Sequence, residues 1–136
     1  MPDQFVVPPL SSTGPAATEE EIDVADVTSS LRSLMVRKMG ILRDRAGLQE
    51  AERTVAFWSR YALGREFDTP AGWELQNLLT VARLMIWAAC ERTESRGTHF
   101  RSDYPEKHDA EWQRHLNCPA TLPERPVPSP ALASVV

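Results

Sequence analysis

The stretch that decides the fold is residues 70–94, PAGWELQNLLTVARLMIWAACERTE. Its apolar residues recur three and four positions apart, the spacing that gathers side chains on one face of an α-helix. Asp68 or Thr69 is a candidate N-terminal cap, and Pro70 suits the first turn of a helix, where its missing N–H costs nothing. We therefore predict a helix here, ended by Gly97. Its apolar face comprises Leu75, Leu78, Leu79, Ala82, Met85, Ile86 and Ala89.

Two earlier segments show the same helical spacing. The first begins after Glu19 with acidic residues and gathers Lys and Arg toward its far end, as the helix dipole prefers. We expect Gly47 to end it. The second covers residues 48–63, and Gly64 is placed to be its C-terminal stop. The apolar faces comprise Val24, Val27, Leu31, Leu34, Met35, Ile41 and Leu42 in the first segment and Leu48, Ala51, Val55, Trp58 and Ala62 in the second.

Three amphipathic helices of roughly twenty residues, joined by short connections, bury their apolar faces most simply against one another. The predicted fold class is therefore all-α: a three-helix up-down-up bundle, similar to a spectrin repeat, over residues 19–117. A short helix at residues 106–116 follows the bundle, and no alternating strand pattern is visible. Residues 1–18 and 118–136 hold most of the eleven prolines and lack spaced apolar residues, so we expect two flexible arms.

Charge and composition exclude several classes of function. The net charge is −4 and the basic residues are scattered, so a nucleic-acid partner is not expected. The apolar run at residues 84–90 is too short to cross a bilayer, and the N-terminus has no basic region followed by an apolar one. We predict a cytoplasmic protein. Cys90 and Cys118 form neither a disulfide framework nor a metal-binding spacing, and reduced thiols are expected.

Recognisable catalytic and cofactor motifs are absent from the sequence. It has no Gly-x-Gly-x-x-Gly after a strand, no phosphate-binding loop and no Gly-x-Ser-x-Gly turn. His108, Glu111 and His115 share a helical face just before Cys118 and could in principle bind zinc; solvated or structural histidines are the favoured interpretation. Cys90 lies in an apolar helix, which raises a thiol pKa and disfavours a nucleophile. We predict no catalytic, cofactor-binding or metal-binding residue in this chain.

Residues 94–107, ESRGTHFRSDYPEK, follow the most apolar run in the chain. They fit a docking surface, the polar end of a helix, or a catalytic site, in decreasing order of preference. Gly97 permits a positive φ, and arginines beside aromatic residues are typical of interface hot spots. The predicted docking loop comprises Arg96, His99, Phe100, Arg101, Asp103 and Tyr104.

Residues 94–105, ESRGTHFRSDYP, closely resemble the ESRG-x-H-x-R-x-DYP signature near the C-terminus of the L-aspartate oxidase family. The Arg-Gly-x-His element is also shared with succinate dehydrogenase and fumarate reductase flavoprotein subunits. Two more matches precede it: LRSLM at 31–35 leading into GILRD at 40–44, and ELQNLL at 74–79. GILRD and Asp-Tyr-Pro favour the aspartate oxidase branch. Val36 departs from the pattern, where the resemblance suggests tryptophan, and this affects local packing.

The resemblance implies a C-terminal helical domain, in agreement with the bundle predicted above. Members of that family oxidise L-aspartate to iminoaspartate with FAD, for quinolinate and NAD synthesis. Their flavin and catalytic residues lie in preceding FAD-binding and capping domains, which have no counterpart here. The resemblance thus implies a domain that is non-catalytic alone and docks onto those domains of a flavoprotein.

The docking hypothesis makes a prediction about the arginines of the loop. If they bind a partner, Arg96→Ala or Arg101→Ala weakens association and leaves the melting temperature nearly unchanged; an equal loss of stability indicates an internal brace. The alternatives are a stand-alone helical interaction module, including a homodimer formed through helix grooves, and a small zinc enzyme using His108, His115 and Cys118.

Overall fold

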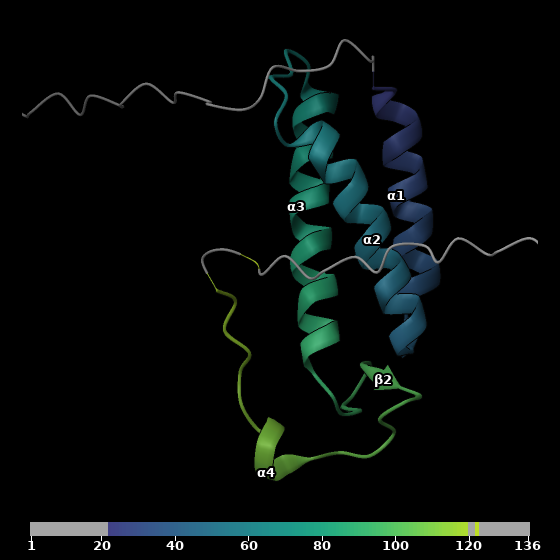
Figure 1. Ribbon diagram of the computed structural model, residues 1–136, viewed down its shortest axis with the longest axis vertical. Helices are drawn as coiled ribbons and strands as arrows, with labels where there is room; N and C mark the ends of the chain where they lie inside the picture. The colour runs from purple at the N-terminus through teal and green to yellow at the C-terminus, as the bar shows by residue number, and fades with distance from the viewer. Residues whose placement is uncertain (1–21, 120–121, 123–136) are drawn as a thin grey trace, which may run out of the picture.

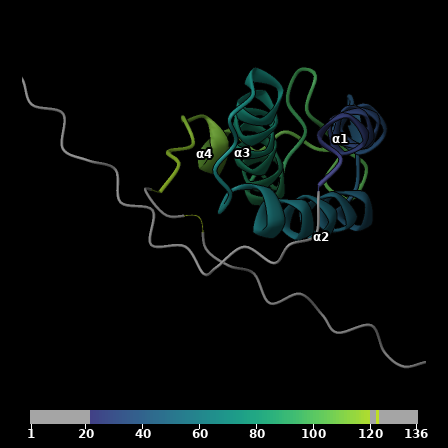
Figure 2. The same cartoon turned by 90° about the horizontal axis from the view of Figure 1, so that it is seen from above.

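Three long helices lie side by side in the computed structural model, which describes residues 22–119 and residue 122 (Figure 1). They are α1 (Val24–Lys38), α2 (Arg45–Ala62) and α3 (Pro70–Glu91), and each contacts the other two. α4 (Asp109–Trp112) is a single turn on the side of α3 away from α1 (Figure 2). The predicted helical architecture is confirmed. Apart from residues 118, 119 and 122, the predicted arms at 1–18 and 118–136 lie outside the described residues.

The space between the three long helices is filled by aliphatic side chains. Because each helix turns once in about 3.6 residues, residues three and four apart meet at this interior, as the sequence predicted. Met85 is an exception: it was predicted on the apolar face of the third helix and is 46% exposed. None of the helices described is long and apolar enough to cross a membrane. The buried core comprises Leu31, Leu34, Met39, Leu48, Ala51, Val55, Ala62, Leu75, Leu79, Ala82, Ile86 and Ala89.

α1 ends earlier than predicted. It stops at Lys38, and Leu42–Arg43 form a short strand, β1, although we expected a helix as far as Gly47. Gly47 instead lies in the first turn of α2, where its N–H donates to the Asp44 carboxylate at 2.6 Å. Asp is among the strongest N-terminal caps, so Asp44 starts a new helix where the sequence pattern alone suggested the end of the first.

α3 begins as predicted and ends sooner. The Thr69 hydroxyl accepts a hydrogen bond from the Gly72 N–H at 3.3 Å, and Pro70 is the first residue of the helix. Gly72 is needed for packing, because a Cβ there would lie 2.4 Å from the Phe67 ring. The helix ends at Glu91, before the predicted boundary at residue 94. The residues that follow make buried polar contacts that a helix would not allow.

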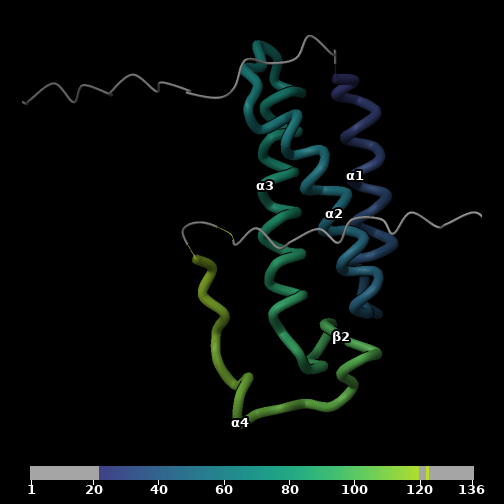
Figure 3. The backbone as a smooth tube through the Cα atoms, viewed as in Figure 1, coloured from purple at the N-terminus to yellow at the C-terminus, as the bar shows by residue number. Residues whose placement is uncertain are grey.

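A two-stranded parallel sheet corrects the expectation of a fold without strands. β2 (Phe100–Arg101) pairs with β1 so that Leu42 lies opposite Phe100, whose N–H donates to the Ile41 carbonyl at 3.1 Å. Strands of two residues are too short to show an alternating pattern, which is why the sequence did not reveal them. The pair ties the α1–α2 connection to the loop that leaves α3 (Figure 3).

The fourth helix is also shorter than the predicted 106–116. Arg92 donates to the carbonyls of Trp112, at 3.1 Å, and Arg114, at 3.0 Å, and so binds groups that a longer helix would use internally. The Trp112 ring is buried, with the guanidinium carbons of Arg92 and Arg114 at 5.2 and 5.4 Å from its centre. These cation–π contacts hold the single turn of α4 against the end of α3.

Candidate docking site

The predicted docking loop lies over one end of the bundle, where α1 ends, α2 begins and α3 ends (Figure 3). We call this region, residues 40–45 and 92–108, the loop end. Arg96 and His99 pair their backbone groups at 2.8 and 3.0 Å across a tight turn. Gly97 in this turn has φ +59°, the left-handed conformation that glycine adopts most readily. The expectation that Gly97 serves a positive φ is confirmed.

Glu94 is the centre of the polar contacts at the loop end. It is 0% exposed, and its carboxylate accepts hydrogen bonds from Arg96 at 2.7 and 3.0 Å, Arg92 at 2.5 Å and the His108 N–H at 2.9 Å. The bonds from Arg96, with those from His108 and Arg92, lower the pKa of Glu94 to about 2, although burial alone would raise it. A buried charge is tolerated only when its partners are all in place.

Arg96 extends this cluster to α4. Its Nη2 donates to the Asp109 carboxylate at 2.6 Å as well as to Glu94. These two carboxylates raise the pKa of Arg96, and the hydrogen bond from Arg96 lowers the pKa of Asp109. The guanidinium thus joins the end of α3 to the start of α4 within one chain. The docking hypothesis had instead expected Arg96 to bind a partner.

Arg101 is buried and donates hydrogen bonds to carbonyl groups at the C-terminal end of α3. It is 2% exposed, and its Nη1 donates to the carbonyls of Ala89 at 2.9 Å and Arg92 at 3.3 Å. Its Nε and Nη2 bind the two oxygens of Asp103 at 2.8 and 2.6 Å, which lowers the pKa of Asp103. The last carbonyls of a helix have no partner within it, and here a bidentate arginine supplies one. Arg101 was expected to bind groups of a partner, but the contacts observed for it lie within its own chain.

His99 is held as a neutral imidazole between two elements. Its Nδ1 lies 2.9 Å from Arg43 Nη1, and its Nε2 lies 3.3 Å from the Arg92 carbonyl. Since a guanidinium can only donate, Nδ1 accepts and Nε2 carries the proton. Burial lowers the pKa of His99, and the positive charges of Arg43, Arg101 and Arg92 lower it further, against the opposing hydrogen bond to the carbonyl.

Apolar side chains at the loop end face outward. Ile41 is 64% exposed, Leu42 66% and Phe100 41%. Tyr104 is half-buried: its hydroxyl accepts a hydrogen bond from Arg45 at 2.5 Å, and its ring lies 5.0 Å from the Arg101 guanidinium. Of the six residues predicted for the docking loop, five bond within the chain and Phe100 alone presents a mainly apolar, exposed side chain.

Sequence reasoning missed the contribution of the α1–α2 connection. Ile41 and Leu42 were assigned to the apolar face of the first helix. The available signal was Gly40, a helix stop, followed after three residues by Asp44, a helix cap, with an apolar pair between them. Nothing in the sequence singled out Glu94 as the buried centre of the loop.

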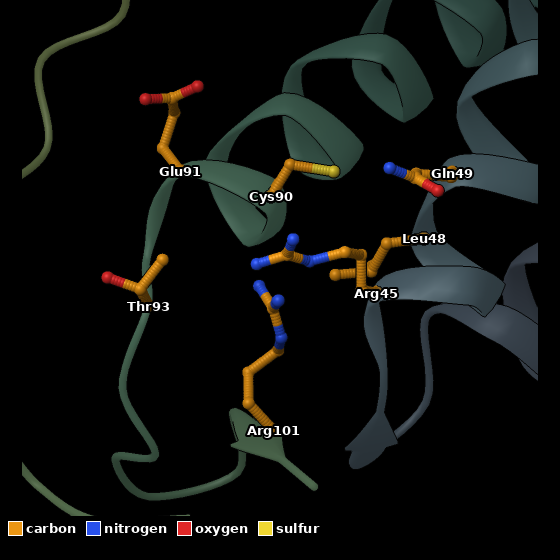
Figure 4. A pocket seen from close by; sticks show the side chains of 7 residues that line it. All are labelled: Arg45, Leu48, Gln49, Cys90, Glu91, Thr93 and Arg101. Atoms are coloured by element: carbon orange, nitrogen blue, oxygen red, sulfur yellow. The ribbon is translucent and has the colours of Figure 1, made fainter. Parts of the chain in front are cut away.

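A hollow of about 350 Å³ lies beside the loop end, between α2 and the end of α3 (Figure 4). The side chains of Arg45 and Arg101 point into it near Cys90. The N–H donors of Arg101 already bind groups within the chain. Arg101 therefore has little capacity left to bind a ligand in this hollow. The lining comprises Arg45, Leu48, Gln49, Cys90, Glu91, Thr93 and Arg101.

Comparisons with known proteins find sequence similarity to flavoproteins. Residues 67–127, which include α3, most of the loop end and α4, match the family described as fumarate reductase flavoprotein C-terminal. The L-aspartate oxidase of Pseudomonas aeruginosa is 35% identical over 65% of this chain and 17% of its own length. That of Rhodospirillum rubrum is 38% identical over 88% and 37%, and the succinate dehydrogenase flavoprotein subunit of Rickettsia bellii is 34% identical over 69% and 17%.

The chain belongs to this flavoprotein superfamily as a C-terminal helical domain. It spans about one sixth of the Pseudomonas and Rickettsia proteins and 37% of the Rhodospirillum protein. No solved structure matches the chain.

The described residues of this flavoprotein C-terminal domain do not fit a flavin dinucleotide. Such a cofactor needs a glycine-rich turn between a strand and a helix, where backbone N–H groups bind the pyrophosphate. Here the strand-to-helix junction is β1–α2, and Asp44 occupies the cap position and takes the N–H of Gly47 with its own carboxylate. An anionic side chain at that position opposes a phosphate. The flavoprotein family implies FAD in its full-length members.

The residues considered for zinc are not gathered into a metal site in the described part of the chain. Over residues 22–119 and 122, no three His, Cys, Asp or Glu side chains are grouped so that they could hold a metal ion. The backbone N–H of His108 donates to Glu94, and the Cys118 thiol donates to the Pro119 carbonyl at 3.4 Å. The structure gives no support to a zinc enzyme.

Proposed function

We propose that this flavoprotein C-terminal domain is part of an FAD-dependent oxidoreductase of the L-aspartate oxidase type, which converts L-aspartate to iminoaspartate for quinolinate and NAD synthesis. The similarity to the oxidases of Pseudomonas aeruginosa and Rhodospirillum rubrum supports this assignment. The Rickettsia bellii dehydrogenase subunit matches about as well. The choice of branch therefore rests on the GILRD motif at 40–44 and the Asp-Tyr-Pro motif at 103–105.

The domain acts by docking, and it is non-catalytic alone. The observation that carries this role is the exposure of Ile41, Leu42 and Phe100 on a loop end whose charged side chains bond to one another. Rigid support improves an interface because less entropy is lost on binding. In this role the arginines keep the loop in shape, and the apolar side chains contact the FAD-binding and capping domains.

Other parts of the proposal follow from the sequence. The short α1–α2 and α2–α3 connections favour antiparallel neighbours, hence an up-down-up bundle. The proposal also includes a cytoplasmic location. It includes no nucleic-acid partner, because the basic residues are scattered.

Affinity capture tests the docking role. The tagged chain is captured from the cells that make it, and the eluate is assayed for the visible absorbance of bound flavin and for peroxide production that depends on L-aspartate. We expect both signals to accompany the chain. Recovery of the chain without a flavoprotein contradicts the proposal.

A matched pair of variants makes the capture specific. Phe100→Ser removes an exposed apolar side chain at the loop end, and we expect it to lower flavin recovery by about tenfold. Phe57→Ser removes one that is 51% exposed on α2, away from the loop end, and we expect recovery to be unchanged. Equal losses in the two variants point to general stickiness and contradict docking through the loop end.

A stand-alone module that pairs with itself is the second candidate. It is favoured by the exposed side chains of Val81, Leu84 and Met85, which share one face of α3. Sedimentation equilibrium distinguishes the two candidates. A dimer that Val81→Ser dissociates supports self-association through α3, whereas a monomer at micromolar concentration leaves the docking role preferred.

A further inference from the structure

The outer edge of β1 has unpaired backbone groups. In a parallel pair, alternate residues of a strand direct their N–H and C=O toward the neighbour. The Ile41 and Arg43 carbonyls face β2, because they accept the N–H groups of Phe100 at 3.1 Å and Ser102 at 2.9 Å. The N–H and C=O of Leu42 therefore point to the opposite side. Within the described part of the chain they form no hydrogen bond.

The outer edge of β2 is closed by contrast. The Arg101 N–H donates to Ser95 Oγ at 2.8 Å. The Arg101 carbonyl accepts from the Tyr104 N–H at 3.0 Å and from Ser95 Oγ at 3.2 Å. One side of this small sheet is completed by its own loop, and the other side is open to solvent at a residue that is 66% exposed.

Exposed apolar side chains flank the open edge on both faces. Leu42 and Phe100 are directly paired, so their side chains share a face of the sheet. Ile41 precedes Leu42, and successive side chains of a strand alternate between faces. An exposed edge with apolar neighbours is a template for another extended chain.

We propose that the outer edge of β1 binds an extended, apolar segment of the flavoprotein part as an added strand. This inference rests on the proposed docking function and names its contact. An extended backbone is the partner that satisfies both the N–H and the C=O of Leu42 and places side chains on both faces. The exposed faces of α2 and α3 offer side chains only, because their backbone groups bond within the helices. The relatives extend far beyond the part that this chain matches. That additional length is the source of the extended segment in this proposal.

Amide hydrogen exchange tests the open edge directly. We expect the Leu42 amide to exchange rapidly in the free chain and at least about tenfold more slowly in the captured flavoprotein complex. The Phe100 amide, which donates to Ile41, is the internal control and is protected in both. A Leu42 amide that is already protected in the free monomer overturns the inference without reference to any partner.

Two substitutions at one position separate backbone from side chain. Leu42→Ala and Leu42→Pro both remove the leucine side chain, but only proline removes the N–H. Proline is tolerated at an edge strand when the missing N–H faces outward. We expect Leu42→Pro to weaken binding of the purified flavoprotein about tenfold relative to Leu42→Ala, with similar melting temperatures for the two chains. Equal affinities overturn the inference.

The outcomes distinguish this inference from the docking function. If a complex forms and the protection falls on residues 81–85 of α3, the docking function stands and the edge-strand contact is overturned. If no flavoprotein binds, the docking function itself fails, and the edge-strand contact fails with it. Protection at Leu42 that disappears when the free chain is diluted identifies a second copy as the occupant and also overturns the inference.

Discussion

The interior between the three long helices and the interior of the loop end are both shielded from water, yet they use opposite chemistry. Leu48, Leu75 and Leu79 fill the first, and Glu94 and Arg101 occupy the second. Apolar burial has no direction and tolerates small shifts. A buried charge needs several partners at fixed positions at the same time. The comparison teaches that one region is specified by spacing along the helices and the other by a complete set of polar partners.

The largest expected effect is in the apolar region. Leu79→Ala removes a side chain that is 0% exposed and should lower the free energy of unfolding by about 3 kcal/mol, through lost burial and the cavity left behind. Urea unfolding followed by circular dichroism measures it. A loss below about 1 kcal/mol means that the helices repack around the cavity, and the contrast with the loop end is weaker than described.

Arg101→Ala tests whether the polar region also supports the fold. It leaves the Ala89 carbonyl and Asp103 without their main donor and the Arg92 carbonyl without one of its donors, and we expect a loss of about 2 kcal/mol in the free energy of unfolding. Arg101→Lys keeps the positive charge but lacks the planar guanidinium that binds both oxygens of Asp103, so it should restore only part of the lost stability. An unchanged melting temperature in Arg101→Ala would return this residue to the docking role first expected from the sequence.

Glu94→Gln keeps the shape of the side chain and removes its charge. Because the pKa of Glu94 falls from 4.5 to about 2 on folding, the carboxylate stabilises the fold fully above the unfolded value. That contribution is lost as the pH falls from 4.5 toward 2. The variant should therefore have a lower melting temperature near neutral pH, smaller in effect than Arg101→Ala, and a flatter acid dependence than the parent chain. Thermal unfolding at a series of pH values checks both points, and parallel curves for the two chains would contradict the role of this carboxylate.

His99 gives a weaker effect at milder pH. Its pKa is lowered on folding from 6.5, so its neutral form stabilises the fold above that value, and the contribution declines as the pH falls below it. Urea unfolding at about pH 7.5 and about pH 5.5 should show a loss that His99→Gln does not share. An NMR titration that gives His99 a pKa at or above 6.5 would show that its contacts with Arg43 and the Arg92 carbonyl do not favour the neutral ring.

Arg32→Ala supplies the smallest effect and a baseline for charge. Arg32 pairs with Glu74 at 2.9 Å, but both side chains are about 60% exposed, at 63% and 59%. Exposed pairs contribute little because water and salt screen them, so the change should be below about 0.5 kcal/mol. Urea unfolding in low and high salt checks this. A loss comparable to that of Arg101→Ala would show that burial is not what distinguishes the loop end.

Sequence reasoning predicted the apolar region better than the polar one for a physical reason. Helical spacing is a local property, so α2 and the start of α3 were found within a few residues of their observed positions. Gly97 was identified as a site of positive φ because few other residues adopt one. Ile41 and Leu42 continued the apolar spacing of α1 and were therefore misplaced inside the bundle.

The loop end could not be assembled from the sequence because its contacts join distant segments. Phe100 pairs with Leu42, and His99 meets Arg43, through the fold alone. The motif at 94–105 indicated that the segment was unusual, but composition does not tell whether an arginine bonds inside or outside its own chain. Burial decides that question, and Arg101 is inside.

The pairing of β1 with β2 also has a consequence for the order of events during protein synthesis. β1 leaves the ribosome well before β2, since α2 and α3 lie between them in the chain. Closing such a long loop is slow compared with forming the helices, so the small sheet is completed after the bundle. The open edge at Leu42 thus becomes a proper strand edge only when the domain is finished. A partner that recognises this edge would ignore partly made chains, and assembly would wait for folding to end.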